Sequence, residues 1–226
     1  MKHVLDNPVW SALNSNNKSF ANGNEIATYF DPAVSPFVSV QENTPANLEI
    51  LHQTIPFAKP VLLVSVTKLT IPDCWYVLNR VDGVQMVYSK RSGIAHYDSA
   101  IRPLSDEHVP QMMALTNVTK PGPFAEKTIE LGHYKGIFDA DKLVAMAGQR
   151  LHAFEFAEIS AVCTHPDYVG RGYARHLLAD QLQRILDVSE TPYLHVRSDN
   201  TRAVQLYERL GFDTRTEVFF YVLQKK

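Results

Sequence analysis

The residues best suited to chemistry lie in two short stretches of the C-terminal half. The first, Val169-Gly170-Arg171-Gly172-Tyr173-Ala174, joins an apolar stretch to a helical pattern. Its two glycines let the backbone approach a ligand closely, and the first amides of a helix have no intrahelical acceptor. Such a turn suits a phosphate group, and the side chains of Arg171 and Arg175 add positive charge there. By itself the motif is equally compatible with an ordinary tight turn into a helix.

The second stretch begins at Asn200 and continues as Thr-Arg-Ala-Val-Gln-Leu-Tyr. On a helix Asn200, Ala203 and Tyr207 are spaced at i, i+3 and i+7, which places them on one face. A small alanine beside two polar residues is not typical of a core-packing face, so we expect this face to contact a ligand. A phenol with an ordinary pKa of about 10 can donate a proton there. The alternative is a core tyrosine whose hydroxyl is satisfied.

Together the two stretches resemble the motifs of the GCN5-related N-acetyltransferase (GNAT) superfamily, and the C-terminal half resembles its FR47-like group. The family pattern Gln/Arg-x-x-Gly-x-Gly/Ala is matched except at Val169, where a polar contact is lost. The pattern Asn-x-x-Ala-x-x-x-Tyr-x-x-x-Gly-Phe is matched at every named position, up to Phe212. The resemblance covers roughly residues 99–226. It implies an α/β (α+β) GNAT fold, a mixed central sheet flanked by helices.

The resemblance implies transfer of an acetyl group from acetyl-coenzyme A to the amine of a small molecule or amino acid, by direct attack in a ternary complex. The pyrophosphate would bind at the glycine turn, and the pantetheine arm would lie where the preceding strand separates from the strand at residues 193–196. Tyr207 would be the general acid that protonates the departing thiolate. The implied cofactor-binding residues are Val162, Cys163, Thr164, Val169, Gly170, Arg171, Gly172, Tyr173, Ala174, Arg175, Asn200, Ala203 and Tyr207.

The resemblance also suggests a catalytic base. Phe156-Ala157-Glu158-Ile159, at its distance from the glycine turn, resembles the histone acetyltransferase branch, where that glutamate deprotonates the amine. Glu158 is therefore the predicted base. Two alternatives stay open: Glu158 is a carboxylate paired with a nearby cation, or another group such as water or Glu155 removes the proton. Cys163 lacks the His/Asp arrangement of an acyl-accepting nucleophile and is interpreted as a packing residue.

Hydrophobic periodicity and turn residues predict the elements that position these groups. Ser105 is expected to cap a helix that begins at residue 106, with His108 at the acidic position of a capping box. Gly211 is expected to end the last helix in a left-handed conformation. The predicted strands are residues 101–104, 134–138, 143–150, 158–164, 193–196 and 218–223, and the predicted helices are residues 106–117, 173–186 and 200–210.

Residues 1–97 are predicted to form a smaller α/β domain, a degenerate GNAT-like copy, ahead of a GNAT domain at residues 98–226. The polar segment Ser89-Lys90-Arg91-Ser92-Gly93 is interpreted as the linker. In tandem relatives such a half completes the sheet or walls the acceptor site, and an unrelated cap domain is the alternative. By the same resemblance, Trp75, Tyr76, Phe124 and the Pro121-Gly122-Pro123 bend are expected to shape the acceptor pocket.

Composition narrows the classes of protein to which the chain can belong. The 226 residues are 45% hydrophobic with a net charge of −2, so no global positive field favours nucleic acid or an anionic membrane. The start lacks the apolar core of a signal peptide and no run approaches a membrane span, so a cytoplasmic protein is expected. The two cysteines and nine histidines show no metal-ligand spacing.

The expected partners are thus acetyl-coenzyme A and an amine, without nucleic acid, membrane or metal. A homodimer is compatible with these patterns, and the oligomeric state and the acceptor's identity stay open. The alternative from another class is a non-catalytic acyl-coenzyme A-binding sensor or regulatory module. Tyr207 and Glu158 argue against that alternative, because a binding module needs neither a general acid nor a base.

Overall fold

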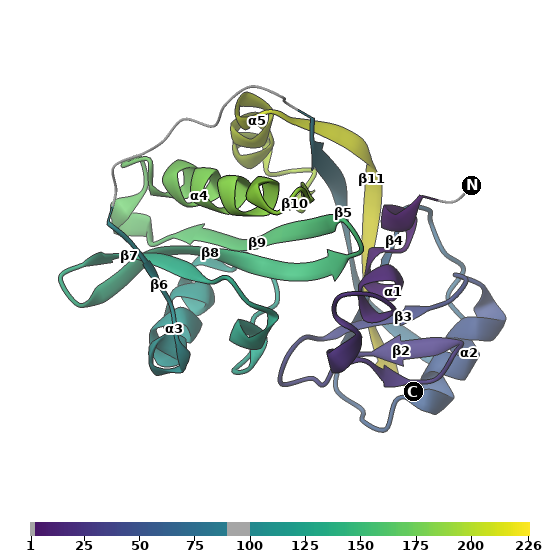
Figure 1. The fold of residues 1–226 in the computed structure, drawn as a ribbon. Coiled ribbons are helices and arrows are strands. Elements are labelled where there is room, and N and C mark those ends of the chain that lie inside the picture. The colour runs from purple at the N-terminus through teal and green to yellow at the C-terminus, as the bar shows by residue number, and fades with distance from the viewer. Residues whose placement is uncertain (1–2, 90–99) are drawn as a thin grey trace.

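The computed structural model describes residues 3–89 and 100–226. Their strands form one mixed sheet of eleven strands in the order β1-β2-β3-β4-β11-β5-β10-β9-β8-β7-β6. The sheet curls, and helices pack on both of its faces (Figure 1). Among the helices of the described residues, none is long and apolar enough to cross a membrane.

The C-terminal half follows the predicted element order. A capping box between Ser105 and His108 begins the 3-10 helix η3 as predicted. Gly211, with φ of 105°, closes the last helix in the left-handed conformation. The elements are β6 (Ile101–Pro103), η3 (Asp106–His108), α3 (Val109–Thr119), η4 (Thr128–Leu131), β7 (Lys135–Asp139), β8 (Lys142–Ala153), β9 (Phe156–Thr164), η5 (Pro166–Tyr168), α4 (Tyr173–Asp187), β10 (Thr191–Arg197), α5 (Thr201–Leu210) and β11 (Phe212–Lys225).

Helix α4 buries one apolar face against the sheet. The sequence spaces Leu177, Leu178, Leu182, Ile185 and Leu186 as one apolar face, and all of them are buried except Leu186, which is exposed. The polar interruption, Gln181, is also fully buried. Its Nε2 donates to His133 O (2.8 Å), and its Oε1 accepts from Arg184 Nε (3.2 Å). A buried amide that is bonded at both ends costs the core little, which explains why the pattern tolerates it.

The described part of the N-terminal half supplies five strands and two α-helices. Its sequence pattern marks short stretches, helical or extended, at residues 4–13, 46–53, 61–66, 75–81 and 84–88, without deciding between helix and strand for each. The first two form η1 with α1 and α2, the third forms β4, and the last two join in one strand, β5. The elements are η1 (Val4–Asp6), α1 (Pro8–Leu13), η2 (Lys18–Phe20), β1 (Asn22–Gly23), β2 (Ala27–Tyr29), β3 (Phe37–Val40), α2 (Pro45–Thr54), β4 (Val61–Ser65) and β5 (Trp75–Tyr88).

The two halves share the sheet through β5 and β11. β5 inserts between β11 and β10 and is antiparallel to both, while the other edge of β11 pairs with β4. Most of the predicted linker, residues 90–93, lies outside the described residues. The division at residue 97 therefore stays a prediction, but the sheet runs without interruption through strands from both sides of it (Figure 1).

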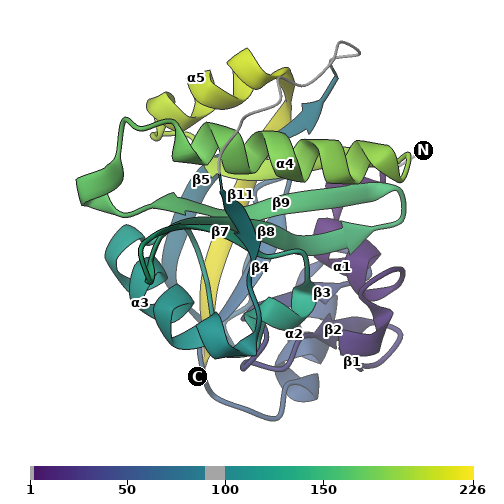
Figure 2. The ribbon, with the colours of Figure 1, turned by 60° about the vertical axis from the view of Figure 1, so that its left-hand side comes forward.

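The two faces of the C-terminal sheet carry different helices (Figure 2). Helices α4 and α5 pack with β5, β9 and β10 around a core that includes Leu178, Leu182 and Phe212. On the opposite face α3 packs with β7, β8 and β9 around Met112, Met146 and Tyr134. Two different sets of helices and side chains therefore flank the two faces of the sheet where β9 meets β10.

Candidate active site

Strands β9 and β10 are paired at one end and separate at the other. They pair in parallel from Thr191 opposite Phe156 to Tyr193 opposite Glu158. Beyond that pair β9 continues to Thr164 and β10 to Arg197, and the described residues show no further pairing between the two strands. The result is a fork whose open end can admit an extended ligand.

A bulge in β9 lies just inside the fork. Ala161 has φ of 53°, and the register of β9 against β8 shifts between the pairs Met146–Cys163 and Gly148–Ser160. A bulge of this kind re-aims the backbone groups that follow it and bends the strand. Here it separates the pairing of Ser160 with Gly148 from that of Cys163 with Met146, beyond the point where β9 and β10 stop pairing.

The glycine turn lies where the chain leaves β9 and enters α4 (Figure 2). Gly170 and Gly172 have φ of 91° and 81°, a conformation that glycine adopts without strain. Gly172 is the N-cap of α4 and has no capping side chain. In the described part of the chain, no bond occupies the amides of residues 170–174. These amides form a patch of unused donors at the positive end of a helix dipole.

The side chains around the turn differ in exposure. Val169 and Arg171 are exposed, Tyr173 and Ala174 are half-buried in the first turn of α4, and Arg175 is exposed. The Arg171 guanidinium lies 4.7 Å from the centre of the Tyr168 ring. Positive charge therefore stands next to the unused amides, and its role in binding stays a prediction.

The last residues of β9 line one side of the fork. Cys163 and Thr164 pair with Met146 and Ala145 of β8, which leaves the side toward β10 unpaired, and Val162 is half-buried between them and the bulge. Burial raises the pKa of the Cys163 thiol to about 11, so this group stays a neutral thiol. The buried hydroxyl of Thr164 has no hydrogen-bond partner in the described chain.

Helix α5 places the second motif beside the same fork. Asn200 Oδ1 accepts from Ala203 N (3.2 Å), so Asn200 is the N-cap of α5. Ala203 and Tyr207 pack toward the core formed with α4, and the Tyr207 ring lies 6.0 Å from that of Phe212. Burial raises the pKa of Tyr207 to about 12. Within residues 3–89 and 100–226 its hydroxyl has no recorded hydrogen bond, unlike the satisfied hydroxyl of the alternative interpretation.

Glu158 lies at the closed end of the fork and is fully buried. Arg150 Nη2 and Nε donate to its two oxygens (2.5 and 2.9 Å), and Leu151 N donates to Oε2 (3.3 Å). His195 Nδ1 lies 2.7 Å from Oε1. Burial alone would raise the pKa of Glu158, but the charge of Arg150 and the hydrogen bonds from Arg150 and His195 lower it to about 2. These surroundings match the ion-paired alternative, and the role of base stays a prediction.

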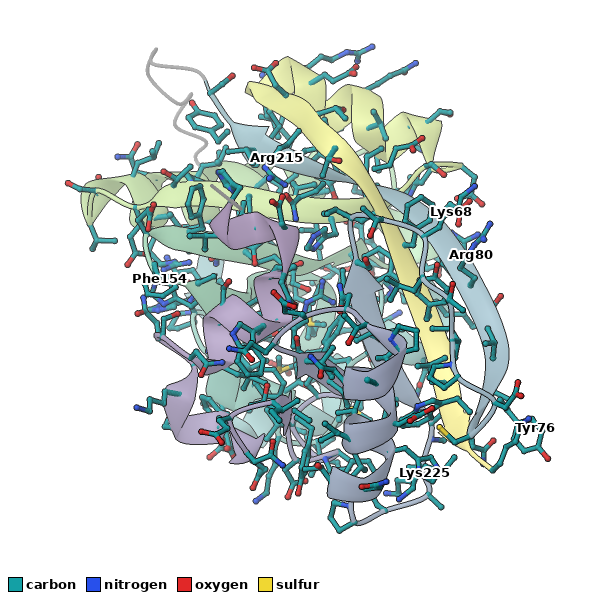
Figure 3. All side chains as sticks on the ribbon, turned by 90° about the vertical axis from the view of Figure 1, so that its right-hand side faces the viewer. Lys68, Tyr76, Arg80, Phe154, Arg215 and Lys225 are labelled. Atoms are coloured by element: carbon teal, nitrogen blue, oxygen red, sulfur yellow. The ribbon has the colours of Figure 1, made fainter. Side chains whose placement is uncertain are left out.

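The polar network continues from His195 into the N-terminal half. Gln85 Nε2 lies 3.0 Å from His195 Nε2 and donates to Leu5 O (3.0 Å). Arg215 Nη1 donates to Gln85 Oε1 (2.8 Å), and Arg215 also pairs with Asp6. Figure 3 shows Arg215 beside the first helical turn of the chain. The fork is thus tied to η1, β5 and β11 by buried and partly buried polar contacts.

Sequence reasoning did not find Arg150, His195 or Gln85. His195 follows Tyr193 by two residues on β10, so strand alternation places both on one face, but nothing local indicates the partner. Trp75 instead lies in the core with α2, where its indole donates to Leu48 O (2.9 Å). Tyr76 is 54% exposed at the far end of β5 (Figure 3). Phe124 packs edge-on against Tyr134, with ring centres 5.6 Å apart.

Comparison with known proteins agrees with this geometry. The model of the FR47-like protein family matches residues 134–221. The crystal structure of a putative acetyltransferase of the GNAT family from Novosphingobium aromaticivorans is 32% identical, with a TM-score of 0.91 over 100% of both chains. The chain belongs to the GCN5-related N-acetyltransferase family. This GNAT protein therefore keeps the family fold over its whole length.

More distant relatives match parts of the GNAT chain. A GCN5-related N-acetyltransferase from Kribbella flavida, 14% identical, covers 96% of this chain and 95% of its own with a TM-score of 0.66, which shows the shared fold. A segment of 86 residues is 37% identical to the N-alpha-acetyltransferase RimI of Mycobacterium tuberculosis, covering 35% of this chain and 51% of that one. The chain matches about half or less of its curated relatives' lengths.

A metal site was not expected from the sequence. In the described residues no group of three or more His, Cys, Asp or Glu side chains is arranged to hold a metal ion. The groups that the fork offers are instead backbone amides, arginines, a phenol and buried polar side chains, which suit an anionic, amide-rich ligand.

Proposed function

We propose that this GNAT protein transfers an acetyl group from acetyl-coenzyme A directly to the amine of a small molecule or amino acid. The observation that carries the proposal is the fork between β9 and β10, which opens toward the unused amides of the glycine turn, while Tyr207 of α5 packs in the core with both strands and α4. The amides can hold a diphosphate, and Tyr207 would supply the proton donor. Acyl transfer from a thioester needs both.

The residues at the fork fit coenzyme A. The amides of residues 170–174, with Arg171 and Arg175, would hold the diphosphate, since a helix start and two glycines favour an anion there. The unpaired side of Val162, Cys163 and Thr164 would bond the amide-rich pantetheine arm. Val169, Tyr173, Ala174, Asn200 and Ala203 would border the same ligand. The bound thioester supplies the activated acetyl group.

Tyr207 is the proposed general acid. Because burial raises its pKa to about 12, the phenol keeps its proton at any ordinary working pH and is available as a donor. A donor held near the sulfur would stabilise the charge that develops as the thiolate leaves. Its exposed fraction is only 8%, so little water competes for that bond.

The proposed role of Glu158 changes with its surroundings. Its two oxygens already receive bonds from Arg150 and Leu151 and face His195, and a carboxyl with a pKa of about 2 has little tendency to take a proton from an ammonium group. We therefore favour an anchoring role for Glu158. In this proposal the acceptor enters as the neutral amine or loses its proton to water.

The same observation keeps a second candidate, a non-catalytic acyl-coenzyme A sensor. Because Glu158 is engaged in an ion pair, Tyr207 is the remaining residue that argues for turnover. Titration of acetyl-coenzyme A combined with a thiol-release assay across an amine panel separates the two functions. Tight binding without thiol release from any amine would favour the sensor, whereas release with at least one amine supports the transferase.

The role of Tyr207 is tested by Tyr207→Phe, which deletes only the hydroxyl. We expect kcat to fall by roughly one to three orders of magnitude, because general acid catalysis contributes about that much. The affinity for acetyl-coenzyme A, measured by titration calorimetry, should change little. If kcat is unchanged, Tyr207 has no part in the mechanism.

The relatives' names indicate different acceptors. One is the N-alpha-acetyltransferase RimI, and another is a mycothiol acetyltransferase from Corynebacterium aurimucosum. The acceptor must therefore be inferred from this chain. We propose that the N-terminal half walls the acceptor side, since Lys127 N donates to Ala33 O (2.9 Å) and Thr128 Oγ1 to Val34 O (2.6 Å). These bonds hold the loop after α3 against residues 33 and 34.

A further inference from the structure

One edge of the Arg150 guanidinium is unused. Nε and Nη2 both bond to Glu158, whereas Nη1 has no hydrogen bond to any described residue. The Phe37 ring lies 4.7 Å from the guanidinium carbon and covers one of its faces. A Cβ added to Gly122 would lie 3.8 Å from Nη1, and Gly122 is exposed. The free edge therefore lies just beneath a surface glycine that leaves it uncovered.

Two buried phenols near Arg150 also lack partners. Neither the Tyr134 nor the Tyr193 hydroxyl bonds to any described residue, and both residues are at least 97% buried. Tyr193 stands opposite Glu158 in the register of β9 and β10, and the Tyr134 ring packs over Gly148, two residues before Arg150 on β8. A buried hydroxyl without a partner costs stability, so a partner from outside the chain, such as a ligand or an ordered water, is expected at each of them.

The net charge around these donors is close to zero. The Gln85 amide has two hydrogens, one bonded to Leu5 O and the other directed at His195 Nε2, so His195 accepts there and carries its proton on Nδ1, facing Glu158. Arg150 and Glu158 cancel each other. The other ionisable groups nearby, Tyr134, Tyr193 and Cys163, stay neutral because burial raises their pKa values.

A net charge close to zero favours uncharged ligands over anionic ones at these donors. A carboxylate placed here would be a buried charge without a counter-ion, which is strongly unfavourable. An uncharged carbonyl oxygen would instead accept bonds from the guanidinium edge and a phenol with no charge to compensate, and bonds to a charged donor are among the stronger ones. Tyr134 belongs to the core under α3, whereas Tyr193 belongs to the core with α1 and β3, whose Phe37 packs on Arg150. Both cores lie on the face of the sheet opposite α4.

We propose that Arg150 Nη1 and the Tyr134 and Tyr193 hydroxyls form a subsite for an uncharged carbonyl oxygen of the acceptor. The acceptors are then amines next to an amide, such as amino-acid amides and peptide N-termini, rather than free amino acids. This inference rests on the proposed function, because it assigns the acceptor end of the same fork. It narrows the acceptor class that the family membership leaves open.

The test compares three acceptors with the full chain and acetyl-coenzyme A: alaninamide, alanine and propan-2-amine, which has no carbonyl. We expect kcat/KM for alaninamide to exceed that for alanine by about tenfold or more, since a buried unpaired charge is rejected. Tyr134→Phe should raise KM for alaninamide about three- to tenfold, the value of one hydrogen bond. The same variant should leave propan-2-amine kinetics and acetyl-coenzyme A affinity unchanged.

Thermal unfolding separates this role from a structural one. Because the Tyr134 hydroxyl bonds to none of the described residues, Tyr134→Phe should not lower the Tm. The matched control is Tyr221→Phe, whose hydroxyl accepts from Leu69 N (2.9 Å) at the far end of β11. That variant should lower the Tm and leave acceptor preference unchanged. Arg150→Lys keeps a cation for Glu158 but removes the free edge, so it should abolish the amide preference.

Three results would overturn the subsite: a preference for alanine over its amide, unchanged alaninamide kinetics in Tyr134→Phe, or an equal loss with propan-2-amine. If acetyl-coenzyme A binds but no amine is acetylated, the proposed function fails and the subsite is tested by binding alone. Ligand-observed NMR with alaninamide then decides. Binding that Tyr134→Phe weakens would support the subsite, and no binding would reject it.

Discussion

The two ends of β9 differ in whether their polar groups are bonded within the protein. At its C-terminal end the chain passes through Gly170 and Gly172 into α4, and the amides there are exposed and unused. At its N-terminal end Glu158 is fully buried, and both of its oxygens are bonded. One strand therefore carries an open anion site at one end and a closed ion-pair network at the other, with the fork between them.

This difference distinguishes a site that binds a ligand from a network that holds the fold in place. A ligand site must keep its polar groups unsatisfied until the ligand arrives, whereas an anchor must satisfy them within the protein. The network of Arg150, Glu158 and His195 joins β8, β9 and β10 at the closed end of the fork. We infer that the closed end holds the geometry and that the open end binds the cofactor.

The sharpest way to break this comparison is Glu158→Gln. Removing one partner leaves the buried Arg150 charge uncompensated, so we expect the free energy of unfolding to fall by about 3–5 kcal/mol. Chemical denaturation measures it. The control is Glu190→Gln, whose pair with His152 (2.9 Å) is partly exposed and should cost less than about 1 kcal/mol. Equal losses in the two variants would show that the network is not an anchor.

The same pair predicts an acid dependence of stability. The pKa of Glu158 is lowered from 4.5 to about 2 on folding, so its contribution is complete above its ordinary pKa and is lost as the pH falls toward 2. Unfolding free energies of the wild type should therefore decline between pH 4.5 and 2. Glu158→Gln should show a shallower decline in that window. A slope that the substitution leaves intact would assign the acid sensitivity to other carboxylates.

Gly172→Val tests the open end. A valine at this position would have to adopt a φ of 81°, which strains its backbone, and its side chain would enter the space in front of the unused amides. The affinity for acetyl-coenzyme A should therefore weaken by roughly two orders of magnitude. Titration calorimetry measures the change. Gly132→Ala is the control for strain, because Gly132 has φ of 100° and no atom within 4 Å of its added Cβ, away from the turn. Unaltered affinity in Gly172→Val would place the cofactor elsewhere.

The smallest expected effect comes from Asn200. Its side chain caps α5 through Ala203 N, so Asn200→Ala should lower the unfolding free energy by about 1 kcal/mol. Asn200→Asp retains the capping oxygen and removes the amide donor. If Asn200 only caps the helix, the aspartate variant keeps both stability and cofactor affinity. A loss of affinity in Asn200→Asp alone would show that the amide group also contacts the ligand.

Much of the C-terminal half could be predicted because its signals are local. The glycine turn, the buried face of α4 and the Gly211 cap each depend on residues within one or two helical turns. The continuity of β5 was harder to predict, because Gly83 lies between the stretches at residues 75–81 and 84–88 and looks like a break between them. In the structure a Cβ at Gly83 would lie 2.7 Å from Val196 O, so this glycine permits close strand approach within one continuous strand.

The sequence by itself determined the family, the element order of residues 101–226 and the glycine turn, since helix caps and periodicity are written in neighbouring residues. Only the tertiary structure decided what surrounds Glu158. Its partners Arg150 and His195 come from two other strands, and strand pairing, which depends on contacts distant in sequence, brings them together. The tertiary structure also decided that β5 lies between β10 and β11, because its edges are satisfied by strands more than 100 residues away.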